Sequence, residues 1–177
     1  MAIFLTSDWH FNHDKTFIYE PRNFSTKEEH NLAIITLHNE VVSPDDDVYV
    51  LGDLMLGDNK EGIELIKKMN GNLHIILGNH DTSNRIKEYK NCPNVKSIQY
   101  AYRLKHGKWN FYLSHCPMVV AHEEDDKEKL WSLHGHTHSK NKFCDIPHCY
   151  NVALDAHYCC PVKIEKIIED IRNRFLE

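Results

Sequence analysis

Short apolar runs alternate with amphipathic stretches in the first half of the chain. Three runs have the length and polar boundaries of buried strands; they cover Ala2–Ser7, Val48–Leu51 and Leu73–Leu77. A capping-box pattern of Ser25 with Glu28 predicts a helix that ends near Val41. The apolar spacing over residues 63–69 predicts a second helix before the third run. This alternation of strand and helix is typical of parallel βαβ units.

The second half of the chain has a different pattern. Tyr100–Lys105 and Lys108–Ser114 are predicted to form a hairpin around His106–Gly107. Two further short strands are expected, over Trp131–His134 and Tyr150–Leu154. A last helix begins at Pro161 and carries apolar residues at helical spacing as far as Phe175.

The remaining segments are predicted to be loops. Residues 11–24 have no clear period, and the charged run Glu123–Lys129 is expected to be a solvated loop or helix start. Together the elements predict a mixed α/β fold that is parallel in its first half and antiparallel in its second.

Length and composition narrow the class of protein. The chain has 177 residues, which suits one domain over 1–177, and it has no apolar run long enough to span a membrane. The formal net charge of -5 disfavours strong binding of nucleic acid. Because the N-terminus has no signal-peptide pattern and the six cysteines are not spaced as a disulfide framework, we expect a cytoplasmic protein.

Histidine is abundant, and many of the fourteen His residues cluster with Asp, Asn and Gly. These clusters follow five predicted strands, at Asp8-Trp9-His10, Asp53, Asn79-His80-Asp81, His115 and Gly135-His136-Thr137-His138. In open α/β sheets, ligands bind at the carboxyl ends of strands, so the clusters are expected to meet. Glycines that precede three clusters, Gly52, Gly78 and Gly135, permit sharp turns.

This residue chemistry suits hydrolysis of a phosphoester. Such a reaction needs charge neutralised on the phosphate oxygens and a nucleophile available near neutral pH. Two divalent metal ions roughly 3.5–4 Å apart supply both. Carboxylate, imidazole and amide ligands suit Mn, Fe, Zn or Ni, and we expect Mn first. A separate structural zinc at Cys144, Cys149, Cys159 and Cys160 is disfavoured by the poor spacing.

The ordered motifs Asp-x-His, Gly-Asp, Gly-Asn-His-Asp, a lone His and Gly-His-Thr-His resemble the calcineurin-like metallophosphoesterase superfamily. The resemblance extends from Thr6 to about Pro161. The segments 8–13, 22–24 and 151–156 further resemble a small bacterial and phage branch of that superfamily. A four-layer αββα sandwich is the fold that the resemblance implies. The stretch after Gly52-Asp53 lacks an acidic residue that many relatives have there, and we interpret this as variation outside the ligand set.

The resemblance also implies roles for individual residues. Asp8, His10 and His138 would bind one metal, and Asn79, His115 and His136 the other, with Asp53 bridging the two. His80 would face the substrate and either stabilise the transition state or protonate the leaving group. Asp81 would hydrogen-bond His80 and orient it.

Other residues near the motifs have competing interpretations. Arg22 could clamp a substrate phosphate, because a guanidinium matches phosphate oxygens in a bidentate way, or it could be an ordinary surface residue. Asn12 and His13 follow the first ligands and could line the pocket, His13 being the better candidate. Asp155 and His157 could orient ligands, although the end of a strand explains Asp155 almost as well.

The expected function is therefore hydrolysis of a small phosphoester or nucleotide-type substrate by a metal-bridging hydroxide. Phosphodiesters are favoured over monoesters, because so short a chain leaves no room for a cap domain. One alternative is a nuclease acting on DNA or RNA ends, against which the acidic balance and the lack of a basic-aromatic stripe count. Another is a non-catalytic metal-binding scaffold, against which the full set of ligands and His80 count. The physiological substrate and the oligomeric state do not follow from the sequence.

Overall fold

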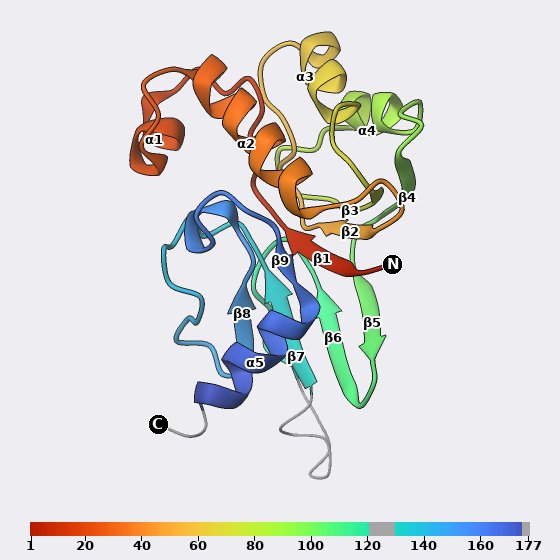
Figure 1. The fold of residues 1–177 in the computed structure, drawn as a ribbon, viewed down its shortest axis with the longest axis vertical. Coiled ribbons are helices and arrows are strands. Elements are labelled where there is room, and N and C mark those ends of the chain that lie inside the picture. The colour runs from red at the N-terminus through yellow and green to blue at the C-terminus, as the bar shows by residue number, and fades with distance from the viewer. Residues whose placement is uncertain (121–129, 175–177) are drawn as a thin grey trace.

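Two β-sheets pack against each other in the computed structural model, which describes residues 1–120 and 130–174 (Figure 1). The first sheet has the strand order β4-β3-β2-β1-β9. Its strands are β1 (Ile3–Thr6), β2 (Asp47–Val50), β3 (Asn72–Ile76), β4 (Val95–Gln99) and β9 (Val162–Lys163). Strands β1 to β4 are parallel, and β9 pairs antiparallel with β1. The predicted parallel βαβ units of the first half are confirmed.

The second sheet has the order β5-β6-β7-β8. Its strands are β5 (Tyr102–His106), β6 (Trp109–Leu113), β7 (Leu130–His134) and β8 (Cys149–Asn151). Among the described strands of this sheet, the β5–β6 hairpin is antiparallel, whereas β6–β7 and β7–β8 are parallel pairs. The predicted antiparallel second half is therefore confirmed for the hairpin and for β9, and wrong for β7 and β8. The chain segments between these strands are long enough for crossovers, which parallel pairing requires and a tight turn does not allow.

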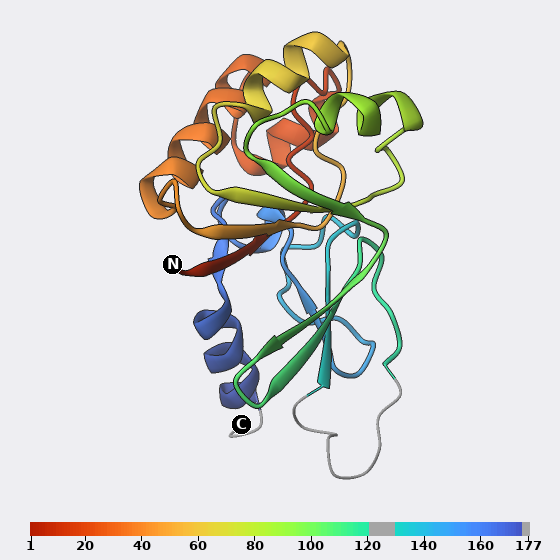
Figure 2. The same ribbon diagram turned by 90° about the vertical axis from the view of Figure 1, so that its right-hand side faces the viewer.

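Helices cover both sheets, as Figures 1 and 2 show. Three helices pack on the first sheet: α2 (Lys27–Val41), α3 (Asn59–Ile66) and α4 (Ser83–Tyr89). Helix α5 (Ile164–Arg174) packs its isoleucines into the core that the second sheet shares with the first. The mixed α/β fold with helices against two stacked sheets is thus confirmed. None of the described helices is both long and apolar enough to cross a membrane.

Alternation along the strands divides the core in two. On β1, Phe4 faces the helices, while Leu5 faces the second sheet. This division follows from the period of two in a strand, which sends successive side chains to opposite faces. Strand β1 is consequently buried on both sides and positions the residues that follow it.

Several predicted boundaries differ from those in the structure. Helix α2 is capped one residue later than expected, because the Thr26 hydroxyl accepts from the Glu29 backbone N–H at 3.1 Å. The hairpin turn lies at Gly107–Lys108, and α5 begins after β9 rather than at Pro161. The segment 11–24, predicted as a loop, contains α1 (Thr16–Tyr19) and the 3-10 helix η1 (Glu20–Arg22). Phe175 and the charged run 123–129 lie outside the described residues.

Candidate metal centre

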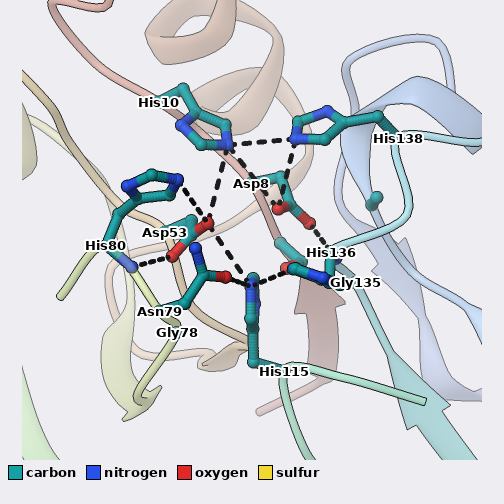
Figure 3. Close-up of polar contacts among 12 residues, drawn as sticks. Asp8, His10, Asp53, Gly78, Asn79, His80, His115, Gly135, His136 and His138 are labelled. Atoms are coloured by element: carbon teal, nitrogen blue, oxygen red, sulfur yellow. Dashed lines mark hydrogen bonds and ion pairs between the residues drawn. The ribbon is translucent and has the colours of Figure 1, made fainter.

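The five polar clusters meet where the two sheets adjoin (Figure 3). Asp8, Asp53 and Asn79 follow β1, β2 and β3 of the first sheet, and the remaining clusters follow β6 and β7 of the second. A bridge between Ser7 and Ala153 joins the strand ends of the two sheets. Residues from both halves of the chain thereby face one another across a single centre.

One group of side chains consists of Asp8, His10 and His138. The Nε2 atoms of His10 and His138 lie 3.2 Å apart. Asp8 Oδ1 lies 3.7 Å and 3.8 Å from these two nitrogens, too far for a hydrogen bond. This oxygen is buried and has no hydrogen-bond partner among the described residues. Such spacing suits ligand atoms that each lie about 2.1 Å from a common ion.

A second group consists of Asp53, His115 and His136, with Asn79 beside them. His115 Nε2 lies 2.9 Å from Asn79 Oδ1, 3.1 Å from His136 Nδ1 and 3.3 Å from Asp53 Oδ2. Asp53 Oδ2 also lies 3.8 Å from His10 Nε2 of the first group. The Asp53 carboxylate therefore stands between the two groups.

Hydrogen bonds on the far sides of two rings determine which nitrogen faces the centre. His115 Nδ1 donates to the Leu51 carbonyl at 2.8 Å, and His138 Nδ1 donates to Asp155 Oδ2 at 3.1 Å. In the neutral rings, this leaves the lone pairs of both Nε2 atoms directed inward. Outer hydrogen bonds of this kind are typical of metal-binding histidines.

The ligand groups that point into the centre are mostly lone pairs and negative oxygens, which a positive charge between them would stabilise. His115 Nε2 faces two oxygen acceptors, Asn79 Oδ1 and Asp53 Oδ2. Burial by itself would lower the pKa of His115, but the Asp53 and Asp8 carboxylates outweigh it and raise the pKa to about 9. A proton satisfies this arrangement in the metal-free chain, and a divalent cation satisfies the same set of lone pairs. The donor set fits two metal ions.

The backbone is strained where the candidate ligands lie. Five of the seven have left-handed φ angles, between 48° and 67°: Asp8, His10, Asp53, His136 and His138. Non-glycine residues seldom adopt this region, and it persists where surrounding structure enforces it, often at functional sites.

Two of the glycines that precede the clusters are required because other groups approach them closely. A Cβ on Gly78 would overlap the Asp53 carboxylate, and one on Gly135 would overlap Ser7 Oγ and Asp8 Oδ2. Neither glycine has a positive φ, whereas Gly52, at 89°, does. Turns do follow Gly78 and Gly135, because the Asp81 N–H donates to the Gly78 carbonyl and the Thr137 N–H to the Gly135 carbonyl, but only Gly52 uses the conformational freedom of glycine.

Comparison with known proteins identifies the family. The family model for calcineurin-like phosphoesterases matches residues 1–155. The chain belongs to the calcineurin-like phosphoesterase family. An uncharacterised protein of Methanocaldococcus jannaschii is 33% identical over 97% of this chain and 92% of its own length. The gene 66 protein of Mycobacterium phage D29 is 28% identical over 97% of this chain and 98% of its own length. A protein of unknown function from Aquifex aeolicus shares the fold, with a TM-score of 0.73, 23% identity and coverage of 95% and 98%.

In this calcineurin-like phosphoesterase, His80 lies at the rim of the centre. Its side chain is 44% exposed, and its Nε2 lies 3.9 Å from Asp53 Oδ2. Its backbone N–H donates to Asp53 Oδ1 at 2.9 Å, which ties its turn to the Asp53 carboxylate. The ring contacts His10 and faces the region between the two groups (Figure 3).

The expected hydrogen bond from Asp81 to His80 does not occur. The Asp81 carboxylate instead accepts from the backbone N–H groups of Gly78 and Asp53, at 2.8 Å and 2.9 Å, and from the Tyr89 hydroxyl at 2.7 Å. Asp81 is buried, and its hydrogen bonds join the turn after β2 to the turn after β3. Tyr89 was missed because α4 was not predicted, although Ile86 and Tyr89 have helical spacing.

The Arg22 guanidinium is fully engaged by protein groups. Its buried guanidinium forms a bidentate pair with Asp155, at 3.0 Å and 2.7 Å, and donates to the Asp8 carbonyl at 2.9 Å. Its remaining terminal nitrogen lies 2.9 Å from His30 Nε2. Arg22 is therefore linked through Asp155 to His138, and because it is buried, it is not an ordinary surface residue. Asp155 contacts a candidate ligand as one interpretation proposed, whereas His157 binds the Asn151 carbonyl.

The structure separates Asn12 from His13. The Asn12 side chain pairs with Asn31 and Glu61 and faces α2 and α3. The His13 ring contacts His10, with centroids 5.5 Å apart, and its Nδ1 accepts from the Lys15 backbone N–H. Burial lowers the pKa of His13 to about 4, so the ring is neutral near pH 7. The cysteines belong to neither candidate metal group among the described residues.

Proposed function

We propose that this chain is a binuclear metal-dependent phosphoesterase that hydrolyses phosphodiesters in preference to monoesters. The position of the Asp53 carboxylate is the observation that carries the proposal. One of its oxygens lies 3.8 Å from His10 Nε2 and 3.3 Å from His115 Nε2, within reach of both groups. In the proposed centre, Asp8, His10 and His138 hold one ion, Asn79, His115 and His136 the other, and Asp53 bridges. Mn is the expected metal.

The two ions, when bound, supply positive charge for the phosphate oxygens and lower the pKa of water. The protein's own groups orient the reaction. Asp155 and the Leu51 carbonyl hold the rings of His138 and His115 in one tautomer. His80 donates a hydrogen bond to charge that develops on the phosphoryl or leaving oxygen.

Metal analysis tests the binuclear centre. Mn-loaded protein should contain close to two ions per chain. Asp53→Asn should lose both, because each group shares that carboxylate, whereas His138→Ala should weaken mainly one. A single ion that Asp53→Asn leaves in place would contradict the proposal.

The preference for diesters is supported by exposure at the centre. His136 is exposed, and the side chains of His80 and His138 are 44% and 34% exposed, which leaves room for groups on both sides of a phosphate. We expect kcat/KM for bis(4-nitrophenyl) phosphate to equal or exceed that for 4-nitrophenyl phosphate. A strong preference for the monoester under several metals would exclude the diester assignment but not phosphoester hydrolysis. The six unpaired cysteines support the proposed cytoplasmic location.

A further inference from the structure

Lysines gather beside the metal centre in an arrangement that the sequence does not reveal. Two adjoining hollows, of about 460 Å³ and about 370 Å³, share Lys142, Ala156 and Tyr158 as walls. Lys140 lines the first hollow, and Lys163 and Lys166 line the second. We call Lys140, Lys142, Tyr158, Lys163 and Lys166 the lysine groove.

The groove adjoins the metal centre through Asp155. Asp155 lines the first hollow, and the same carboxylate accepts from His138 Nδ1 at 3.1 Å. Lys140 follows His138 by two residues in the chain. The groove then passes the turn that carries Tyr158 and reaches β9 and the first turn of α5, which lie together in Figure 1.

The groove has a surplus of positive charge although the chain as a whole is acidic. Lys142 and Lys166 share Asp170, at 2.7 Å and 3.1 Å, and Lys166 also pairs with Glu169. These contacts neutralise part of the charge and hold the two side chains in place. Among the described residues, Lys140 and Lys163 form no ion pair, and Asp155 is already matched by Arg22.

The aromatic ring of Tyr158 is exposed to solvent where the two hollows adjoin. Tyr158 is 93% exposed, and it and Cys159 have left-handed φ angles of 53° and 62°. Bulky residues rarely adopt this conformation, and here hydrogen bonds hold it, including one from the Cys159 N–H to the Leu154 carbonyl at 3.0 Å. The strained turn presents the ring outward instead of packing it.

We propose that the lysine groove binds a single-stranded segment of nucleic acid, with backbone phosphates on the lysines and a base stacked on Tyr158. A basic groove with an aromatic platform is the arrangement that single strands require. The inference rests on the proposed function, since the bound strand would lead into the metal centre and be its phosphodiester substrate. This proposal is opposite to the expectation, drawn from the net charge, that the chain does not bind nucleic acid strongly. The net charge does not reveal the groove, because the four lysines are interspersed with acidic residues in sequence and come together only in the fold.

The test is the affinity of the full chain for a fluorescent oligothymidylate, measured by anisotropy with a chelator present so that the strand stays intact. Affinity should fall as salt rises. The double variant Lys140→Gln/Lys163→Gln should bind at least about fivefold more weakly at low salt. It should also reduce the slope of log K against log salt by about 1.4, two contacts at about 0.7 each. Tyr158→Ala should weaken binding by about fivefold or more and leave the slope unaltered.

A matched control removes the same charge elsewhere. Lys87→Gln/Lys105→Gln alters exposed lysines on α4 and β5, outside both hollows. It should bind within about twofold of the unaltered chain. If the control and groove variants lost affinity equally, the loss would be an effect of net charge alone, and the proposal would be overturned. The absence of oligonucleotide binding at low salt would also overturn the proposal, as would full affinity in Tyr158→Ala.

Hydrolysis of bis(4-nitrophenyl) phosphate separates this inference from the proposed function. The groove variants should retain the rate of the unaltered chain, because this small substrate does not reach the lysines. Hydrolysis without oligonucleotide binding would refute the groove alone. Groove-dependent binding in a chain that hydrolyses no phosphodiester would refute the proposed function alone.

Discussion

His80 faces the centre although the neighbouring Asp81 carboxylate is engaged elsewhere, by Gly78, Asp53 and Tyr89. Its backbone N–H bonds Asp53, and its carbonyl accepts from Arg85 at 2.6 Å, so its turn is held independently of the ring. His80→Ala should therefore keep the fold and the metal content of the unaltered chain while kcat falls by roughly 10²–10³, the usual effect of removing one well-placed donor.

Leaving groups distinguish the role of His80 further. The loss in kcat should be smaller for nitrophenyl esters than for alkyl esters, because a good leaving group needs less protonation. Metal analysis of the same preparation serves as the control. A lost metal ion would make His80 a ligand, and full activity with alkyl esters would make it only a turn residue.

Asp155 is the residue through which Arg22 acts on His138. Replacing Asp155 by Asn removes the charge that orients the His138 ring, and such changes typically cost 10–100-fold in metal affinity. We expect Asp155→Asn to weaken Mn binding at one of the two proposed sites, as measured by calorimetric titration. Asp170→Asn, which alters a carboxylate on α5, should leave both affinities unaltered. Equal weakening at both sites would show that Asp155 supports the fold and not one ligand.

At the scale of elements, α2 carries a histidine that must stay neutral. His38 is buried against Trp9 and donates from Nε2 to the Asn70 carbonyl at 2.9 Å. Burial lowers the pKa of His38 to about 4, with the Asn70 carbonyl acting in the opposite direction. The unfolded chain, with a pKa of about 6.5, binds the proton first as pH falls. The stabilisation is therefore fully present above about pH 6.5 and is lost as pH falls toward 4.

This linkage predicts a measurable slope. With a chelator present, His38 should contribute up to about 1.4 kcal/mol per pH unit to the decline in unfolding free energy between pH 6.5 and 4. His38→Gln keeps a donor for Asn70 but cannot titrate, so its profile should be flatter by that amount. Urea unfolding at several pH values measures both profiles. Parallel profiles would contradict the assignment.

At the scale of the whole molecule, the centre connects the two sheets. Asp8 and Asp53 come from the first sheet, while His115, His136 and His138 come from the second. Metal binding should therefore stabilise the packing of one sheet on the other. At a hundredfold excess over Kd, one site contributes about 2.7 kcal/mol. Thermal unfolding should show a Tm that rises with Mn in the unaltered chain and rises far less in Asp53→Asn. The same rise in both would mean that Mn acts elsewhere.

What the sequence determined by itself is the local part of the fold and the composition of the centre. The apolar runs before Asp8, Asp53 and Asn79 predicted β1, β2 and β3, because a buried parallel strand needs a short apolar run whatever surrounds it. Each motif at the end of these strands occupies only a few consecutive residues, so it can be read directly from the sequence. Elements with weaker local patterns were missed; α4 and β4 are short, and β4 carries polar residues at a sheet edge.

Tertiary structure alone decided which distant side chains meet. Strand direction in the second sheet depends on crossovers, and Arg22 is paired by Asp155, 133 residues away. The contacts of Asp81 and the gathering of Lys140 with Lys163 likewise depend on packing between elements. Local patterns record which face of an element is apolar. They do not record which charged or polar groups that burial brings together, because those contacts form between segments whose separation in sequence carries no information about their distance in space.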